Sequence, residues 1–428
     1  MGTLLLKNGR VVSPEDQLDG EFDVLIEDGI IREIAPQISA PAGETLDARG
    51  QVVSPGLVDI HVHLREPGGE ISETLESGLA AAVAGGFTAV CPMPNTKPII
   101  DRPELVRASV EKAQRLGLAR VFPIAAVSMG SQGESLTDFA ALIAAGAVAF
   151  SDDGRPVKSA GLLRRALEKT RELNVQLNDH CEDPSLSARG VVNDGPVAKQ
   201  LGVTGIPDCS EDVCVARDLI IAEATGARLH VCHLSTAGSV ELVRAAKRRG
   251  VRVTCEVTPH HFALSDAAVA EHGTNAKVNP PLRSAQDVEA VLAGIADGTV
   301  DAIATDHAPH APELKAKPFA GDSPFGLIGL ETALGLALTR LVHTGKISLA
   351  HLVVLMSTNP ARVINQPLGR LKVGGAADIT VFDPNLEWTY HAAQGRSKSR
   401  NSPFDGWGLK GAVTATIVAG KIVYRRSA

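Results

Sequence analysis

The sequence predicts an α/β fold, a (β/α)8 TIM barrel with a small discontinuous β-sandwich domain contributed by both chain ends. Three observations support this prediction. The chain has 428 residues, of which 44% are hydrophobic, enough for one large core and a minor domain. Both ends alternate short β-type runs with turn residues. Between them, eight apolar strand-like runs alternate with helical segments.

The two chain ends have the same β-rich texture. Short apolar runs are separated by Gly, Asn, Asp and Pro, which are typical of turns. The runs are 4–14, 23–36 and 45–56 at the N-terminal end, and 376–384 and 415–424 at the C-terminal end. Because neither end can bury a face alone, we expect them to meet in one domain. The predicted units are therefore 1–54 (the N-terminal segment of the β-sandwich), 55–360 (the metal-dependent barrel) and 361–428 (the C-terminal segment of the β-sandwich).

The central region has the repeat pattern of a closed parallel barrel. Helical stretches such as 72–86 and 236–250 separate the strand-like runs, and the second ends in the basic residues and Gly expected at a helix C-terminus. Eight β–α repeats favour a closed barrel over an open doubly wound sheet. The strand-like runs are 52–64, 88–95, 120–128, 147–154, 175–183, 228–235, 252–262 and 300–309.

The composition argues against several classes of protein. The 42 basic and 49 acidic residues give a net charge of −7. No long basic run would follow a phosphate backbone, so we expect no nucleic-acid partner. No apolar stretch approaches the roughly 18 residues of a membrane helix, and the N-terminus lacks a signal-peptide pattern. We therefore expect a cytoplasmic protein with no membrane partner.

The six cysteines show no C-x-x-C spacing. In a large chain without an export signal they are expected to be reduced thiols. Cys232 and Cys255 lie in apolar strand patterns, which favours small buried hydrophobic residues over metal ligands.

Polar residues fall at the ends of the predicted strands. In a barrel, the carboxyl ends of the strands form the rim on which enzymes of this fold place their chemistry. His61 and His63 are two apart on one strand, so their imidazoles share a face and could hold one ion. Such a pair alone also fits solvated or hydrogen-bonded histidines. Other strand ends add Asp152, Asp153, His180, His233 and Asp306, enough ligands for two divalent ions.

The motifs at these strand ends resemble those of the dihydroorotase family. The ordered set is highly specific, although each member is only moderately so. It covers the central domain, and the β-rich ends resemble that family's companion domain. The motifs are HVHLREPG (61–68), MPNT (93–96), FSDDG (150–154), HCED (180–183), CHLS (232–235), EVTPHH (256–261), VNPPLR (278–283), DHAPH (306–310) and PFGLIG (324–329).

The resemblance implies a centre of two Zn²⁺ ions per chain. It assigns ligands to the first ion (His61, His63 and Asp306), to the second (His180 and His233) and to the bridge between them (Asp153). Many relatives use a carboxylated lysine as the bridge. No lysine ends the fourth strand here, and the nearest, Lys158, lies past a turn. Asp152 is the alternative bridge.

The resemblance also implies the chemistry of the site. Two zinc ions sharing a water would lower its pKa from 15.7 to about 7, which makes hydroxide available as the nucleophile. Asp306 would take the proton and pass one to the departing ring nitrogen. The alternative for Asp306 is a ligand without a proton-transfer role.

Arg65 follows His63 on the same strand face and could bind a substrate carboxylate bidentately. The resemblance assigns further substrate contacts to His63, Asn95, Asn279, His310, Pro324, Phe325 and Gly326. Residues 310–326 form a predicted loop that could close over the substrate. The alternatives are a solvated Arg65, a turn-forming Asn95 and a surface excursion for the loop.

The remaining polar residues near the strand ends are expected to support the site or pack around it. These are His230, His260, His261, His307, Glu182 and Asp183, of which the two acids are also candidates for helix capping.

The function implied is the reversible hydrolysis of (S)-dihydroorotate to N-carbamoyl-L-aspartate, a step of pyrimidine synthesis. One alternative is another cyclic amidase, of allantoinase or hydantoinase type. Arg65 and the absence of a strand-end lysine argue against it. The other is a non-catalytic subunit that supports aspartate carbamoyltransferase. Expected partners are the small-molecule substrate, a second copy in a homodimer and aspartate carbamoyltransferase in a complex.

Overall fold

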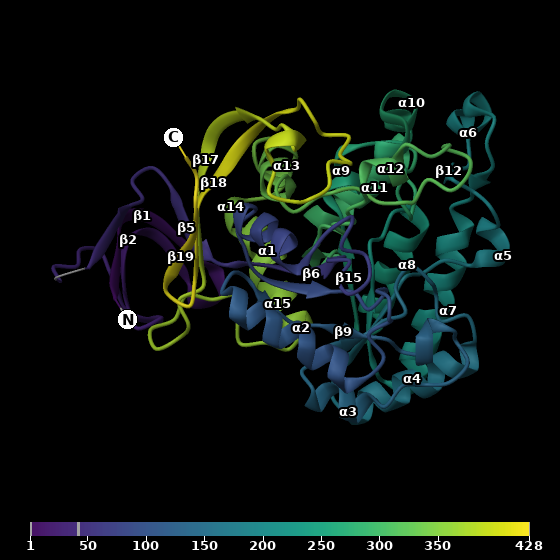
Figure 1. Cartoon of the computed structure of the whole chain (residues 1–428), viewed down its shortest axis with the longest axis horizontal. Helices are drawn as coiled ribbons and strands as arrows, with labels where there is room; N and C mark the ends of the chain where they lie inside the picture. Colours follow the sequence, from purple (N-terminus) through teal and green to yellow (C-terminus); the bar gives the residue numbers. More distant parts are fainter. Residues whose placement is uncertain (1, 41–42, 428) are drawn as a thin grey trace.

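The computed structural model describes residues 2–40 and 43–427. It contains a barrel of parallel strands surrounded by helices and, beside it, a largely antiparallel sheet made from both chain ends (Figure 1). The α/β fold class predicted from the sequence is confirmed.

The sheet beside the barrel joins the two ends of the chain. Its order is β19-β18-β17-β5-β1-β2-β3, with β4 paired to β1. The ends meet where β5 pairs antiparallel with β17. Apolar residues of both ends, among them Ile26 and Ile417, pack in one shared core, as expected for two halves that cannot fold separately. The strands are β1 (Thr3–Ser13), β2 (Leu18–Glu27), β3 (Ile30–Ala35), β4 (Glu44–Asp47), β5 (Val52–Pro55), β17 (Ile379–Thr389), β18 (Gly408–Val418) and β19 (Lys421–Arg425).

The barrel has the eight predicted strand positions. The third is split at Pro123, which has no N–H to donate, so that β8 pairs with β7 and β9 with β10. A parallel bridge between Val62 and His307 joins the first strand to the eighth. The strands are β6 (Leu57–Val62), β7 (Phe87–Pro92), β8 (Arg120–Val121), β9 (Ile124–Ala125), β10 (Ala149–Phe150), β11 (Gln176–Asp179), β14 (Arg228–Val231), β15 (Val253–Val257) and β16 (Ala302–Ile303).

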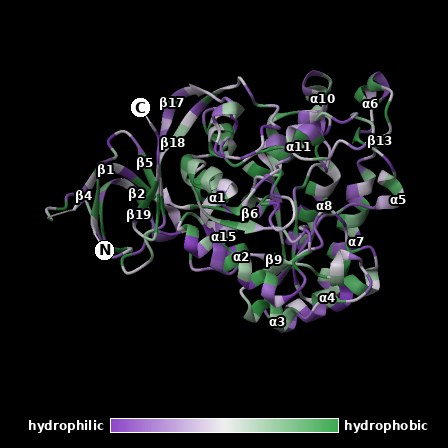
Figure 2. Cartoon of the chain, viewed as in Figure 1, coloured by the Kyte–Doolittle hydropathy of each residue, from purple (hydrophilic) through white to green (hydrophobic). Residues whose placement is uncertain are grey.

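Helices cover the barrel and present apolar faces to it. α1 begins after Thr74, whose side chain forms a reciprocal capping box with Ser77. α4 buries residues at helical spacing, including Leu163 and Leu167, and carries both hydrophobic and hydrophilic colours in Figure 2. The longer helices are α1 (Leu75–Ala84), α2 (Pro103–Leu116), α3 (Phe139–Ala144), α4 (Ala160–Glu172), α6 (Pro196–Leu201), α7 (Cys209–Thr225), α8 (Ala237–Arg248), α10 (Ala267–His272) and α11 (Ala285–Ala296).

Shorter elements lie at the rim of the barrel and in the segment that leads to the sheet formed by both chain ends. They are α5 (Pro184–Ser187), α9 (Pro259–Ala263), α12 (Pro312–Lys315), α13 (Ala333–Ala337), α14 (Leu349–Val353) and α15 (Asn359–Val363), with the strand pair β12 (Val192–Asn193) and β13 (Gly205–Ile206).

The barrel interior is filled by small apolar side chains. Cys91, Ala149 and Cys232 are among its buried residues, and Cys255 is buried as well, in agreement with the sequence prediction for Cys232 and Cys255. The main core contains few aromatic rings, with Phe139 and Phe150 stacked at 3.9 Å. The barrel interior is therefore a packed apolar core. The polar residues lie at the carboxyl ends of the strands.

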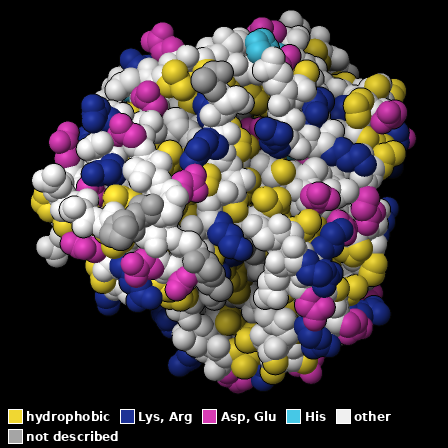
Figure 3. Space-filling view, turned by 60° about the vertical axis from the view of Figure 1, so that its left-hand side comes forward, with side chains coloured by type: hydrophobic (Ala, Val, Ile, Leu, Met, Phe, Trp, Pro, Cys, Tyr) yellow, Lys and Arg dark blue, Asp and Glu magenta, His cyan; other side chains and the backbone are white. Residues whose placement is uncertain are grey.

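Across residues 2–40 and 43–427, no helix combines the length and apolar character that crossing a bilayer requires. Basic and acidic side chains are mixed over the face shown in Figure 3.

Candidate metal centre and substrate site

Six predicted ligands meet at the carboxyl ends of the barrel strands, and all are buried. They come from five different strand ends, so the barrel geometry brings them together from distant parts of the sequence. His61 lies in β6 and His63 follows it, Asp153 follows β10, His180 follows β11, His233 follows β14, and Asp306 follows β16.

His61, His63 and Asp306 form one compact group. The Asp306 Oδ1 atom lies 2.9 Å from His63 Nε2 and 3.6 Å from His61 Nε2. One ligand atom from each residue lies within 4.8 Å of the others, a spacing that suits coordination of one ion.

Asp153 lies at the centre of the four imidazoles. Its Oδ1 is 3.3 Å from His61 Nε2, 3.8 Å from His233 Nε2 and 4.0 Å from His180 Nδ1. Its Oδ2 is 3.5 Å from His63 Nε2. A carboxylate in this position can bind two cations at once and offset their mutual repulsion.

The neighbouring Asp152 makes different contacts. Its Oδ1 accepts a hydrogen bond from the Ser128 backbone N–H at 3.0 Å, and its Oδ2 accepts one from the Ser128 hydroxyl. These contacts tie Asp152 to the loop after β9. The geometry therefore favours Asp153 over Asp152 as a bridge.

Three of the four histidines are hydrogen-bonded through the ring nitrogen that faces away from Asp153. His61 donates from Nδ1 to Glu256 at 2.5 Å, His63 from Nδ1 to Asn95 at 2.9 Å, and His180 from Nε2 to Glu182 at 3.0 Å. With a metal ion bound, each ring would keep this bond in its neutral tautomer, and the opposite nitrogen would supply the lone pair that binds the ion.

Two buried atoms at the centre have no hydrogen-bond partner among the described residues. They are His61 Nε2 and Asp153 Oδ1. Buried polar atoms are rarely left without a partner, and a divalent cation would satisfy both. The residues present therefore fit a metal centre of histidine and carboxylate ligands.

The electrostatics of the centre favour positive charge. Burial alone would raise the pKa of the Asp153 carboxyl, but the charge of His61 and a hydrogen bond from His233 hold it well below its ordinary value. Burial likewise opposes ionisation of Asp306, yet the hydrogen bond from His63 lowers its pKa below the usual range. Both carboxylates are thus kept ionised and able to act as ligands.

Three site residues have strained backbones. Arg65, His233 and Asp306 have φ values of +61°, +34° and +46°, in the left-handed region that non-glycine residues seldom occupy. Beside Asp306, the Asp59 carboxylate accepts hydrogen bonds from the N–H (3.1 Å) and the hydroxyl (2.6 Å) of Thr305. The surrounding fold holds these three residues at backbone φ angles that non-glycine residues disfavour.

Glu256 is a supporting residue to which the sequence motifs assigned no role of its own. It is fully buried at the end of β15 and accepts from His61 Nδ1 at 2.5 Å and His230 Nε2 at 3.1 Å. Burial raises its pKa, but the charge of His61 and the two imidazole hydrogen bonds lower it to about 2. A charged Glu256 fixes the ring orientation of His61. The sequence signal that could have indicated this role is an acidic residue inside an apolar barrel strand, the strand that precedes Pro259.

Substituting Glu256→Gln is expected to weaken metal retention by about 10- to 100-fold, because carboxylates that orient metal-binding histidines contribute on that scale. Competition against a chromogenic chelator measures this. Asp152→Asn, which touches no predicted ligand, is the control. Unchanged retention in Glu256→Gln would contradict the orienting role.

The other supporting residues mostly behave as expected. His307 contacts Glu73 at 3.3 Å, and His261 donates to the Pro280 carbonyl at 3.0 Å. Asp183 caps α5 by accepting from the Ser185 N–H. Neither His260 nor His261 belongs to a potential metal group within the described ranges.

A cavity of about 160 Å³ opens beside the predicted ligands. Its lining contains most of the predicted substrate contacts: His63, Arg65, Asn95, Asn279, His310, Phe325 and Gly326. Pro324 does not line it, because its carbonyl faces Lys315 Nζ at 3.0 Å. The site is small, polar on one side and closed by the loop on the other.

Arg65 is partly buried and held in place. Its Nε donates to the Pro309 carbonyl at 3.0 Å, and a terminal nitrogen lies 3.1 Å from His310 Nε2. His310 Nε2 donates to the Phe325 carbonyl at 2.7 Å. Burial, with the nearby charge of Arg65, lowers the pKa of His310 to about 2, so that His310 is neutral. The guanidinium is then the positive group facing this side of the cavity.

The two asparagines are fixed by the metal-centre residues. Asn95 Oδ1 accepts from His63, and Asn279 Nδ2 donates to Glu182 at 2.6 Å. The turn-forming interpretation of Asn95 is therefore incomplete, since its side chain reaches into the site.

Two buried lysines hold the predicted loop over the cavity. Lys277 and Lys315 donate only to backbone carbonyls of the loop. Lys277 reaches Phe319 (2.8 Å), Gly321 (3.5 Å) and Ser323 (2.7 Å), and Lys315 reaches Pro324 (3.0 Å) and Gly326 (2.9 Å). Burial, with the charge of Lys277, lowers the pKa of Lys315 to about 7. One short helix, α12, interrupts the loop.

A segment between β17 and β18 also supports the loop. Asn401 donates from Nδ2 to the carbonyls of Ala308 at 3.1 Å and Gly326 at 3.0 Å, and its Oδ1 accepts from the His310 N–H at 3.1 Å. Nearby, the Ser399 hydroxyl donates to the Ser72 carbonyl at 2.6 Å. Residues far along the chain thus complete the rim.

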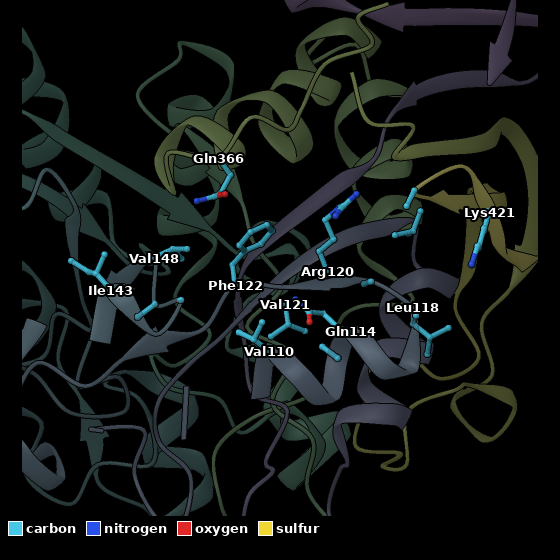
Figure 4. A pocket seen from close by; sticks show the side chains of 17 residues that line it. Val110, Gln114, Leu118, Arg120, Val121, Phe122, Ile143, Val148, Gln366 and Lys421 are labelled. Atoms are coloured by element: carbon cyan, nitrogen blue, oxygen red, sulfur yellow. The ribbon is translucent and has the colours of Figure 1, made fainter. Parts of the chain in front are cut away.

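A larger cavity, of about 650 Å³, lies elsewhere (Figure 4). It is lined by α2, the start of β8 and the turn before β19, with Val110, Phe122 and Lys421 among its residues. None of the predicted site residues lines it. Its position at the amino ends of the strands separates it from the rim.

Known proteins resemble this chain over most or all of its length. The family model described as Dihydro-orotase-like matches residues 50–239. A dihydroorotase of Pelobacter propionicus is 50% identical over 424 residues, covering 99% of this chain and 100% of that protein. A dihydroorotase of Pelotomaculum thermopropionicum is 51% identical over 420 residues, covering 98% of each.

Solved structures share the fold at lower identity. L-Hydantoinase (dihydropyrimidinase) from Arthrobacter aurescens superposes with a TM-score of 0.89 at 28% identity, covering 100% of this chain and 97% of that one. Dihydropyrimidinase from Brevibacillus agri NCHU1002 has a TM-score of 0.84 at 22% identity, covering 99% and 95%, and shows the fold alone.

Proposed function

The chain belongs to the dihydroorotase family, and from this premise we propose that it hydrolyses (S)-dihydroorotate reversibly to N-carbamoyl-L-aspartate with two zinc ions at the barrel rim. It is a hydrolase of cyclic amides that acts in pyrimidine synthesis. The observation that carries the metal-centre proposal is the position of Asp153, within 4.0 Å of all four imidazoles. His61, His63 and Asp306 would hold one ion, His180 and His233 the other, and Asp153 both.

When bound, the two ions would supply hydroxide at neutral pH, because zinc lowers the pKa of water from 15.7 to about 7. Asp306 lines the cavity and takes the proton released as the ring carbonyl is attacked. It returns this proton to the ring nitrogen when the C–N bond breaks. The same residues in reverse order close the ring.

Arg65 would bind the carboxylate that dihydroorotate carries beside its ring. Its guanidinium lines the cavity and is already fixed by the Pro309 carbonyl, so little entropy is lost on binding. Asn95, Asn279 and His310 would contact the ring and its substituents, and Phe325 and Gly326 would close over it from the loop.

Arg65→Met tests the substrate assignment. A lost charged hydrogen-bond pair costs about 1.5–3 kcal/mol, so KM for dihydroorotate is expected to rise about 10- to 100-fold. Hydrolysis of dihydrouracil, which lacks the carboxylate, serves as the matched control. Steady-state assays measure KM and kcat of wild type and Arg65→Met with both substrates. Wild-type protein that hydrolyses dihydrouracil or allantoin but not dihydroorotate would overturn the proposal in favour of another cyclic amidase.

Lys315→Met is expected to raise KM for dihydroorotate about 10-fold while kcat changes less. The Pro324 carbonyl loses its donor and the Gly326 carbonyl keeps only Asn401, which loosens the segment that lines the cavity. Lys315→Arg keeps a cationic donor and should recover most of the affinity. Initial-rate measurements over a range of substrate concentrations decide this. A fall in kcat alone, with KM unchanged, would argue against a role in covering the substrate.

The non-catalytic alternative predicts no turnover even when zinc is supplied. All six candidate ligands are present and gathered, which favours the catalytic assignment. A homodimer, a complex with aspartate carbamoyltransferase and a cytoplasmic location stay predictions. Light scattering, co-purification and fractionation would test them.

A further inference from the structure

A second group of potential metal ligands lies beside His180, on the other side of the strand end. It consists of Asp179, Cys181, Cys214 and Asp218, all buried. Asp179 and Cys181 flank His180 along the chain. Because side chains alternate along an extended segment, His180 faces the metal centre and its two neighbours face α7. α7 supplies Cys214 and Asp218, one turn apart on one face.

Asp218 connects the two thiols. Its Oδ2 accepts from Cys181 Sγ at 3.4 Å and lies 3.9 Å from Cys214 Sγ. Its other oxygen, Oδ1, accepts from Arg217 Nε at 2.6 Å. One carboxylate oxygen is therefore committed to the arginine, and the other is directed at the sulfur atoms.

Asp179 contributes an unsatisfied acceptor. Its Oδ2 is completely buried and has no hydrogen-bond partner within the part of the chain that the structure describes. The nearest cationic group is an Arg217 terminal nitrogen at 3.6 Å. A buried carboxylate oxygen without a donor costs free energy, which a bound cation would recover.

We propose that Asp179, Cys181, Cys214 and Asp218 form a further site for a thiophilic divalent cation, Zn²⁺ or Cd²⁺, separate from the catalytic centre. One ligand atom from each residue lies within 4.8 Å of the others. Tetrahedral zinc with bonds of about 2.0–2.3 Å needs only a small contraction of this group. Two thiolates and two carboxylates are a ligand set that zinc and cadmium accept and that magnesium and calcium do not favour.

The charges of the site are compatible with binding. Burial and the neighbouring Asp218 raise the pKa of Asp179, so coordination releases the proton of this carboxyl and the thiol protons of Cys181 and Cys214 to solvent. The four ligands then carry four negative charges. The cation contributes two positive charges and Arg217, bonded to Asp218, contributes one. The site then has a net charge of −1. Burying this net charge costs less free energy than burying four uncompensated anions.

A small cavity gives the group a route to solvent. It has a volume of about 190 Å³ and is lined by Cys214, Arg217, Glu182, Asp183 and Lys158, among others. The two carboxylates at this opening offset the charges of Lys158 and Arg217, so the opening carries no net positive charge against an entering cation. Once bound, the ion would link the end of β11 to α7. His180 directly follows this strand end.

The test is a Cd²⁺ titration of zinc-loaded protein, carried to an excess of Cd²⁺ that replaces any Zn²⁺ at the thiol site because thiolates prefer the softer ion. Binding is read by the ultraviolet charge-transfer absorption of cadmium thiolates. The predicted catalytic ligands include no thiol, so this signal does not report on that centre. Cys209 is exposed and is first replaced by Ser to remove its contribution. We expect one Cd²⁺ per chain with the absorption of two thiolates. Cys214→Ala should weaken binding more than about 10-fold and remove about half of the band.

Cys232→Ala is the matched control, because Cys232 is a buried thiol in a different group with His61 and Glu256. It should leave the band unchanged. If Cys214→Ala does not fold, Cys214→Ser keeps the side-chain volume and gives the same readout. The proposal is overturned if the Cys209→Ser protein shows no band, or if the band survives Cys214 substitution and disappears in Cys232→Ala.

Discussion

Asp153→Asn is expected to reduce bound zinc from about two ions per chain to one or fewer and to lower turnover of dihydroorotate by at least about 10³-fold. The carboxylate lies between the four imidazoles, 3.3 Å from His61 Nε2 and 3.8 Å from His233 Nε2. An amide of the same shape carries no charge, so two cations held near it would repel each other without compensation. Elemental analysis and a hydrolysis assay on the same preparation measure both effects.

Asp152→Asn provides the matched control for this experiment. The two aspartates are adjacent and both buried, yet Asp152 bonds to Ser128 and not to any predicted ligand. The metal content of Asp152→Asn should stay at the wild-type value. If Asp152→Asn lost metal and Asp153→Asn kept it, the assignment of the bridge would be reversed.

Asp306→Asn is expected to lower kcat by at least about 10³-fold while at least one ion is retained. Positioned proton transfer alone contributes about 10²- to 10⁴-fold, and the substitution also removes a ligand charge. His61 and His63 would still contact the first ion, and Asp153 the second. Metal analysis and single-turnover assays on the same preparation distinguish the loss of proton transfer from the loss of a metal ligand.

Loss of activity with loss of all metal would show that Asp306 acts mainly as a ligand. The side chain of His307, the next residue, contacts Glu73 and the Gly329 N–H and no ligand side chain, so His307→Asn is a suitable comparison for nonspecific damage to this strand end. Turnover in Asp306→Asn within about 10-fold of wild type would contradict the proton-transfer role.

The barrel could be predicted because its signal is local and repeated. Each strand-like run is short, apolar and followed by a helical segment, and the structure has strands at all eight positions. The ligands could be predicted for the same reason, since His63 directly follows a strand and Asp153 and Asp306 each lie three positions after one. What the sequence did not show is the split of the third strand, which depends on the missing N–H of Pro123.

The supporting residues were harder to predict because they depend on long-range contacts. Glu256 meets His61 across 195 positions of sequence. Lys277 and Lys315 would ordinarily be expected in solvent, but the folded loop offers them carbonyls instead. The family resemblance assigned Pro324 to the substrate, and its absence from the cavity lining could not be read from the motif. Lys315 binds the Pro324 carbonyl and turns it aside.

The contacts of Asn401 have a consequence for the order in which the protein matures on the ribosome. The barrel strands are all synthesised before residue 310, but one anchor of the loop over the cavity, Asn401, is synthesised 93 positions after Ala308, whose carbonyl it binds. A nascent chain can therefore gather its ligands early and still lack a finished rim. We therefore expect chains interrupted between residues 310 and 401 to be poor enzymes even when all their barrel strands are present.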